Sequence, residues 1–122
     1  MEADDTEAKG GQEGLAAPSY EAVSFQIISF AGTAKSLFLE AIEAAKRGED
    51  PQPLLDEGDA AYRSASEAHQ RALVQEAEGT LGSGLLLIHA ETILSSAETI
   101  RNLATTIIDL IPSNRDGSKT VQ

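Results

Sequence analysis

The stretch at residues 84–111, GLLLIHAETILSSAETIRNLATTIIDLI, decides the fold. Apolar residues recur along it at alternating steps of four and three, which is the heptad pattern of a helix packed against other helices. This expected seam consists of Leu86, Ala90, Ile93, Ala97, Ile100, Ala104, Ile107 and Ile111. A second apolar set flanks it, consisting of Leu87, Leu94, Leu103, Ile108 and Leu110. Because this face is wider than one helical partner needs, we expect the helix to pack within its own chain and against another subunit.

A second helix is expected at residues 19–47. Ser19 is suited to cap its start, and Gly48 follows two cations at its end, where a left-handed residue is favoured. The heptad stripe of this segment predicts its buried face. That stripe consists of Tyr20, Val23, Ile27, Phe30, Ala34, Leu37, Ala41 and Ala44.

A third helix is expected at residues 51–78, between the Asp50-Pro51 pair and Gly79. Its predicted inner face is rich in alanine and consists of Leu54, Leu55, Tyr62, Ala65, Ala68, Ala72 and Leu73. Gly58 lies inside this segment, where glycine costs about 1 kcal/mol relative to alanine. We therefore expect the first turns of this helix to be loose.

These segments and the lack of any strand pattern predict an all-α fold, a three-helix up-down-up antiparallel bundle. The expected domain covers residues 19–112, with helices at 19–47, 51–78 and 84–111. Residues 1–18 are acidic, rich in glycine and poor in apolar side chains, so we expect a disordered tail. Residues 113–122 are expected to form a flexible polar tail.

Composition excludes several classes of function. The chain of 122 residues has no cysteine, so it has no thiol nucleophile and no cysteine metal site. A net charge of −11 argues against nucleic acid as a partner. The amino-terminal segment lacks the basic and apolar regions of a signal peptide, and charged residues interrupt the apolar stretch at 85–111. We therefore expect a cytoplasmic protein.

His69 and His89 are the two histidines of the chain. His69 falls on the inner stripe of residues 51–78, where a structural histidine with a hydrogen bond is the simpler interpretation. His89 follows four apolar residues and lies on the shoulder of the seam, where we expect it to be half buried. It could serve in acid–base chemistry, as a nucleophile that accepts a transferable group, or in packing alone.

Several short segments are similar to one protein family. They are Ile27-Ile28-Ser29-Phe30-Ala31-Gly32-Thr33-Ala34-Lys35-Ser36-Leu37, Glu67-Ala68-His69 and Leu85-Leu86-Leu87-Ile88-His89-Ala90. Across roughly residues 25–111 the sequence resembles the IIA component of the lactose/cellobiose (N,N'-diacetylchitobiose) family of the bacterial sugar phosphotransferase system (PTS).

The resemblance implies a homotrimer with the helix at 84–111 near its axis. It implies that His89 takes a phosphoryl group from the carrier HPr and passes it to a cysteine of a IIB component, with the IIC component moving the sugar across the membrane. Glu91 and His69 would be supporting residues, and no cofactor is implied. The alternative is a helical interaction or regulatory module that has lost phosphoryl transfer, which an apolar helical face would also suit.

The chain departs from the family where the family reads His-Ala-Gln-Asp-His-Leu-Met. Here the segment reads His89-Ala90-Glu91-Thr92-Ile93-Leu94-Ser95. Thr92 replaces the aspartate that binds a divalent metal in the family, and a neutral hydroxyl is a poor ligand for a hard cation, so we predict no metal on the axis. Glu91 replaces glutamine and is expected to place a negative charge beside His89, which should weaken phosphorylation.

Overall fold

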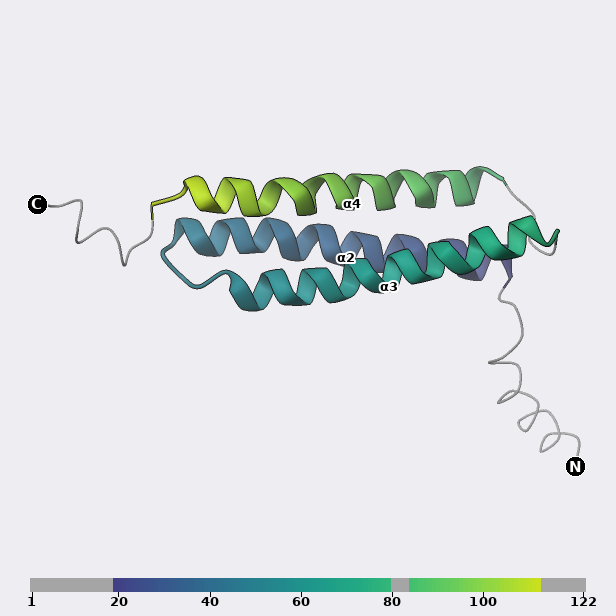
Figure 1. Cartoon of the computed structure of the whole chain (residues 1–122), viewed down its shortest axis with the longest axis horizontal. Helices are drawn as coiled ribbons and strands as arrows, with labels where there is room; N and C mark the ends of the chain where they lie inside the picture. The colour runs from purple at the N-terminus through teal and green to yellow at the C-terminus, as the bar shows by residue number, and fades with distance from the viewer. Residues whose placement is uncertain (1–18, 80–83, 113–122) are drawn as a thin grey trace, which may run out of the picture.

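The computed structural model describes residues 19–79 and 84–112, which form three α-helices. They are α2 (Tyr20–Lys46), α3 (Gln52–Ala77) and α4 (Leu85–Leu110). The helices run up, down and up along one long axis (Figure 1), and the described part of the chain contains no strand. The predicted all-α, three-helix bundle is therefore confirmed. The predicted tails at 1–18 and 113–122 lie outside the described residues.

Local sequence signals set where the helices begin and end. The Ser19 side chain caps α2 by accepting a hydrogen bond from the Ala22 N–H at 3.0 Å. Gly48 and Gly79 take φ values of 81° and 77° just after α2 and α3, a conformation that costs glycine little. The Asp50 carboxylate accepts a hydrogen bond from the Gln52 N–H at 3.0 Å, which satisfies a free donor at the start of α3.

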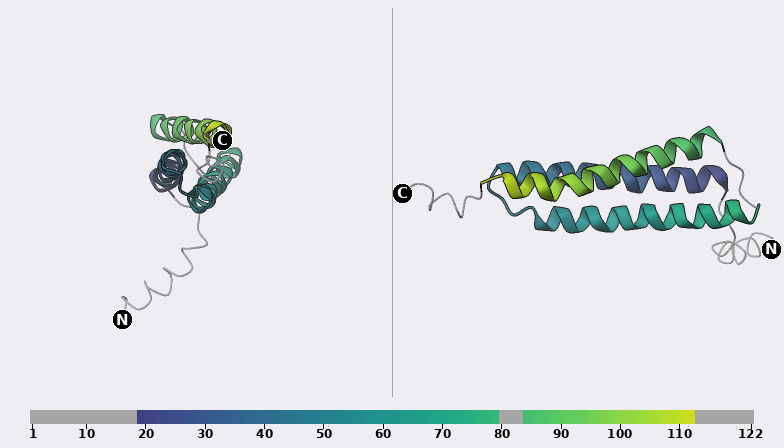
Figure 2. Two further views of the ribbon diagram at one scale, coloured as in Figure 1. Left: turned by 90° about the vertical axis from the view of Figure 1, so that its left-hand side faces the viewer. Right: turned by 45° about the horizontal axis from the view of Figure 1, so that its top comes forward.

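The central helix of the bundle is α2. It packs along both other helices, whereas α3 and α4 contact each other much less (Figure 2). Alanine supplies much of the buried surface, which lets the helix backbones approach closely. The buried core consists of Val23, Ile27, Ala31, Ala34, Phe38, Ala65, Ala68, Ala72, Leu87, Ala90, Leu94, Ala97 and Ala104. The bundle is thus held mainly by the two faces of α2.

The buried face of α2 is rotated from the predicted one. Phe38 is buried to 1% exposure where the heptad pattern placed Leu37, and Phe30, predicted inside, is 40% exposed. Ala31 is buried in its place. An α-helix has 3.6 residues per turn and drifts by about 20° per heptad, so a strict heptad reading slips along a straight helix of this length. The face also has to cover two partner helices instead of one.

The predicted faces of the other two helices are wrong at single positions for the same reason. Leu87 and Leu94, assigned to the flank of the seam, are buried in the core, while the predicted seam residue Ile107 is 38% exposed. On α3, Leu73 was predicted to face inward and is 41% exposed. The core-facing stripe of α4 lies between the two apolar sets, because α2 and α3 contact it from different sides.

Gly58 lies at a close approach between helices. It is buried inside α3, and a Cβ atom built there would lie 2.6 Å from Cε1 of Phe38. Gly58 therefore has a packing role that the sequence did not reveal, because the missing side chain admits the largest fully buried side chain of the core against the α3 backbone. Phe38 gains contact area at the expense of local helix propensity.

One described helix, α2, is long and apolar enough to cross a membrane by length and composition. The core helix of a soluble protein passes the same test. In this structure α2 lies between α3 and α4, and its apolar residues form the core of the bundle.

Candidate functional site around His89

His89 is presented by the second turn of α4. The first turn has no side-chain cap at Gly84, so its backbone donors need other partners. The phenol oxygen of Tyr20, at the start of α2, accepts a hydrogen bond from the Leu87 N–H at 3.0 Å. Tyr20 thereby fixes the beginning of α4 to the beginning of α2 and positions the turn that bears His89.

The side chain of His89 is exposed to solvent, so the prediction that it is half buried is wrong. Within residues 19–79 and 84–112, no group forms a hydrogen bond or ion pair with its imidazole. Its neighbours Leu85 and Ile88 are 83% and 55% exposed, so the histidine lies at the edge of an apolar surface. A neutral imidazole keeps one nitrogen lone pair, and here nothing described in the protomer occupies it. The arrangement suits a nucleophile that a partner protein can reach.

Glu91 does not lie beside His89 in the way the sequence suggested. Its carboxylate Oε2 lies 2.9 Å from Nε2 of His69 on α3, in a contact between residues 22 positions apart. Side chains at positions i and i+2 of a helix point about 200° apart, so His89 and Glu91 leave α4 on different sides. The structure thus brings His69 and Glu91 together and leaves His89 apart from both. We call this contact the His69–Glu91 clasp.

A second polar bridge joins the same two helices. Nε of Arg101 on α4 donates a hydrogen bond to Oδ1 of Asp59 on α3 at 2.8 Å, and the guanidinium lies over the Tyr62 ring, 5.1 Å from its centre. This pair was not predicted from the sequence. Asp59 lies ten residues before His69 and Arg101 ten residues after Glu91, which is the register of antiparallel neighbours and the signal that could have revealed it.

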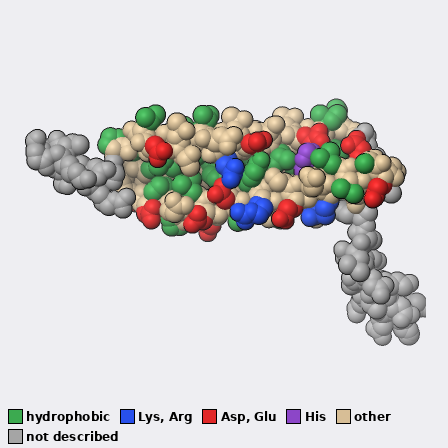
Figure 3. Space-filling view, viewed as in Figure 1, with side chains coloured by type: hydrophobic (Ala, Val, Ile, Leu, Met, Phe, Trp, Pro, Cys, Tyr) green, Lys and Arg blue, Asp and Glu red, His purple; other side chains and the backbone are tan. Residues whose placement is uncertain are grey.

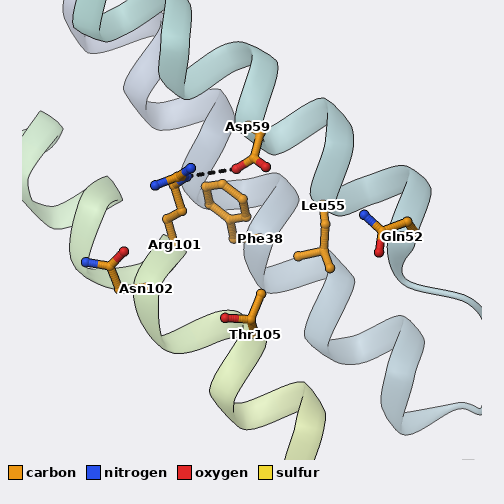
Figure 4. Close-up of a pocket in the computed structure, with 7 residues that line it drawn as sticks. All are labelled: Phe38, Gln52, Leu55, Asp59, Arg101, Asn102 and Thr105. Atoms are coloured by element: carbon orange, nitrogen blue, oxygen red, sulfur yellow. Dashed lines mark hydrogen bonds and ion pairs between the residues drawn. The ribbon is translucent and has the colours of Figure 1, made fainter.

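An open pocket lies beside the Asp59–Arg101 bridge (Figure 4). Its lining comes from all three helices and consists of Phe38, Gln52, Leu55, Asp59, Arg101, Asn102 and Thr105. On the face shown in Figure 3, apolar side chains form a band between α4 and α3, with charged side chains on both sides of it. This band agrees with the sparse contact between the two helices.

The side of α4 that faces away from the core carries a second regular pattern. The exposed α4 face consists of Leu85, Ile88, Thr92, Ser95, Thr99, Leu103, Thr106 and Leu110. The Thr92 hydroxyl donates a hydrogen bond to the Ile88 carbonyl at 3.1 Å, and the Thr99 hydroxyl donates one to the Ser95 carbonyl at 3.1 Å. These two hydroxyls therefore have partners within their own helix, which lowers the cost of covering this part of the face with another apolar surface.

No group of three or more histidine, aspartate or glutamate side chains that could hold a metal occurs in the part of the chain that the structure describes. At the position where the family has a metal-binding aspartate, Thr92 offers a neutral hydroxyl that already donates its proton to the helix backbone. Its residual lone pairs are weak ligands for a hard divalent cation. Thr92 does not fit the metal that the family implies.

Comparison with known proteins agrees with the fold. A family model described as PTS system, Lactose/Cellobiose specific IIA subunit matches residues 22–112. The chain is 37% identical over 93 residues to the lichenan-specific phosphotransferase enzyme IIA component of Bacillus subtilis, covering 74% of this chain and 84% of that protein. It is 31% identical over 91 residues to the PTS system lactose-specific EIIA component of Staphylococcus epidermidis, covering 72% of this chain and 88% of that protein.

A solved structure gives the same result. The crystal structure of the PTS cellobiose specific enzyme IIA from Bacillus anthracis matches this chain with a TM-score of 0.72 and 30% identity, covering 80% of this chain and 93% of that one. The fold and these matches define the protein as a sugar-specific component of the bacterial phosphotransferase system. Within that class the chain belongs to the lactose/cellobiose-specific IIA family. The family resemblance stated from the sequence is confirmed.

Proposed function

We propose that this protein is a phosphoryl carrier, which accepts a phosphoryl group from phospho-HPr on His89 and passes it to a IIB cysteine for sugar uptake. The observation that carries the proposal is the exposed, unengaged imidazole of His89 on α4 in a chain of this family. The protein would work in the cytoplasm and meet the membrane only through the IIC component. Neither a cofactor nor nucleic acid takes part.

The proposed chemistry needs a nucleophile and little else from this chain. The lone pair of a neutral His89 nitrogen attacks phosphorus, a P–N bond forms, and the P–N bond to the donor histidine breaks with its electrons returning to that ring. The thiolate of IIB then attacks the same phosphorus, and the electrons of the breaking P–N bond return to His89. Phosphoryl transfer depends mainly on positioning and charge stabilisation, which accounts for a site without further acid–base groups.

The start of α4 favours the phosphorylated state. Helical side chains lean toward the amino terminus of their helix, so a phosphoryl group on His89 would lie over the first turn of α4. The positive end of the helix dipole is located there, and it stabilises a negative charge by about 0.3–1 kcal/mol at an exposed site. His89 is the fifth residue of α4, which places the phosphoryl group near the outer limit of this effect.

We further propose that the protein assembles into a homotrimer through the exposed α4 face. Four of its members are leucine or isoleucine exposed by at least half, namely Leu85, Ile88, Leu103 and Leu110. Two of the threonines between them, Thr92 and Thr99, donate their hydroxyl hydrogens to the backbone of α4. Three such faces can meet about one axis without converging carboxylates at Thr92, so the trimer needs no metal to offset repulsion.

The test is an intact-mass phosphorylation assay with phosphoenolpyruvate, enzyme I and HPr. Wild type and His69→Gln should each gain one phosphoryl group per chain, and His89→Gln should gain none. His69→Gln is the matched control, because it changes the other histidine of the chain and preserves a hydrogen-bonding side chain. If folded wild type gains no phosphoryl group while HPr is phosphorylated, the non-catalytic interaction or regulatory module becomes the better explanation.

A further inference from the structure

We propose that His69 is a positioning residue for the phosphoryl acceptor: through the His69–Glu91 clasp it holds the Glu91 carboxylate against α3 and away from His89. The inference rests on the proposed function of His89. His69 lies on another helix, 20 positions before His89 in the sequence. The inference is that it affects the rate at which His89 accepts a phosphoryl group.

The His69–Glu91 clasp restrains the Glu91 carboxylate. Nε2 of His69 and Oε2 of Glu91 are 2.9 Å apart, within hydrogen-bond distance. The His69 side chain is only 24% exposed and Glu91 is 41% exposed, so the contact lies at the edge of the bundle with limited access for water. The carboxylate is thus aimed across the α3–α4 contact, on the side of α4 that His89 does not occupy.

The position of Glu91 in the sequence makes this restraint matter. Two positions along a helix correspond to a rise of about 3 Å, so a freely rotating Glu91 could bring its charge to within roughly 8 Å of a group on His89. A phosphoryl group carries about two negative charges. The repulsion at that distance, screened by solvent, corresponds to a rate about three- to tenfold slower. The clasp reduces this repulsion because it points the Glu91 carboxylate away from His89. A protonated His69 imidazole would also compensate the charge of that carboxylate.

The Asp59–Arg101 bridge provides a control for a merely structural role. It joins the same two helices at a similar distance, 2.8 Å, is somewhat more exposed on its α3 side, and lies twelve positions from His89 along α4. If a bridge between α3 and α4 were all that mattered, breaking either one would affect phosphorylation. If the direction of the Glu91 charge matters, only the loss of His69 would.

The experiment measures the initial rate of phosphorylation by phospho-HPr, together with the final extent. His69→Ala should react about three- to tenfold more slowly than wild type, yet reach full labelling. Adding Glu91→Gln to that variant should restore the rate to within about twofold of wild type, because the charge that needed restraint is gone. Asp59→Ala, which removes the acceptor of the Arg101 hydrogen bond, should react as wild type does. The difference between His69→Ala and wild type should shrink at high salt.

The inference is overturned if His69→Ala reacts at the wild-type rate, if Glu91→Gln fails to restore the rate in the double variant, or if Asp59→Ala slows the reaction equally. Circular dichroism establishes that each variant is folded. Should His69→Ala not fold, the salt dependence of the phosphorylation rate is compared between wild type and Glu91→Gln. A restrained carboxylate predicts the same salt dependence for both proteins, and a clear difference between them overturns the inference. Wild type that takes no phosphoryl group on His89 overturns the proposed function itself.

Discussion

Replacing Gly58 with alanine should destabilise the bundle, although helix propensity alone predicts the opposite. Alanine is about 1 kcal/mol more favourable than glycine inside a helix. In this structure the added Cβ would lie 2.6, 2.9 and 3.0 Å from three atoms of the Phe38 ring. The sign of the effect therefore separates the local contribution from the tertiary one.

The magnitude follows from the contact. Carbon atoms that are not bonded pack at about 3.5–4.0 Å, so the ring has to move by about 1 Å. Phe38 is 1% exposed in the core, and overpacking of this kind costs about 1–3 kcal/mol. After the gain in propensity is subtracted, Gly58→Ala should lower the free energy of unfolding by about 1 kcal/mol. For a domain of this size that corresponds to a melting temperature about 4–8 °C lower.

The assay is thermal and urea unfolding at one fixed protein concentration, because an oligomer has a concentration-dependent stability. Phe38→Leu provides the second arm, since it removes the ring atoms that Cβ would meet. In that background Gly58→Ala should be neutral or stabilising, so the two substitutions should couple in a double-mutant cycle. A Gly58→Ala protein more stable than wild type, or one equally destabilised in both backgrounds, would refute the reasoning.

Three further predictions concern single side chains. The Ser24 hydroxyl is fully buried without a hydrogen-bond partner among the described residues, so Ser24→Ala should stabilise the protein by about 1 kcal/mol in urea unfolding; a loss of stability would contradict this. The Arg47 guanidinium, 3.0 Å from Glu49, lowers the pKa of that carboxyl. Glu49→Gln should therefore melt slightly below wild type at pH 7, and the difference in melting temperature should close as the pH falls below about 4.5. A difference that persists in acid would contradict this. Thr92→Asp should weaken self-association in sedimentation experiments with chelator and recover it with Mg²⁺, and an unchanged trimer in chelator would count against the proposed axis.

The fold class could be predicted because its signals are local. The Ser19 cap and the left-handed glycines after α2 and α3 act through neighbouring backbone groups, and the apolar periodicity of three long segments identifies helices. The rotation of each helix was less predictable, as Phe38 and Leu37 show. Which of two adjacent apolar residues is buried depends on the angle between the partner helices, and sequence spacing does not contain that angle.

Part of the candidate site could be predicted from the sequence and part could not. His89 could be singled out from its position in an apolar run, and it lies beside the buried stripe of α4, where the other two helices leave it exposed. The contact between His69 and Glu91 could not be predicted, because it depends on how α3 and α4 are staggered. The sequence therefore predicted the Glu91 charge beside His89, whereas its carboxylate contacts His69. Gly58 was misinterpreted for a similar reason, since its role depends on a ring from another helix.

The most direct test of the central proposal follows one phosphoryl group through the protein. Wild type is phosphorylated through HPr, separated from the donor, and mixed with a IIB component of the lactose/cellobiose type, while intact mass and peptide mapping under non-acidic conditions record both proteins. We expect one phosphoryl group on the peptide containing His89, and its loss from this chain as the IIB cysteine gains it. A phosphoryl group on another residue, or one on His89 that IIB cannot remove, would contradict the proposal.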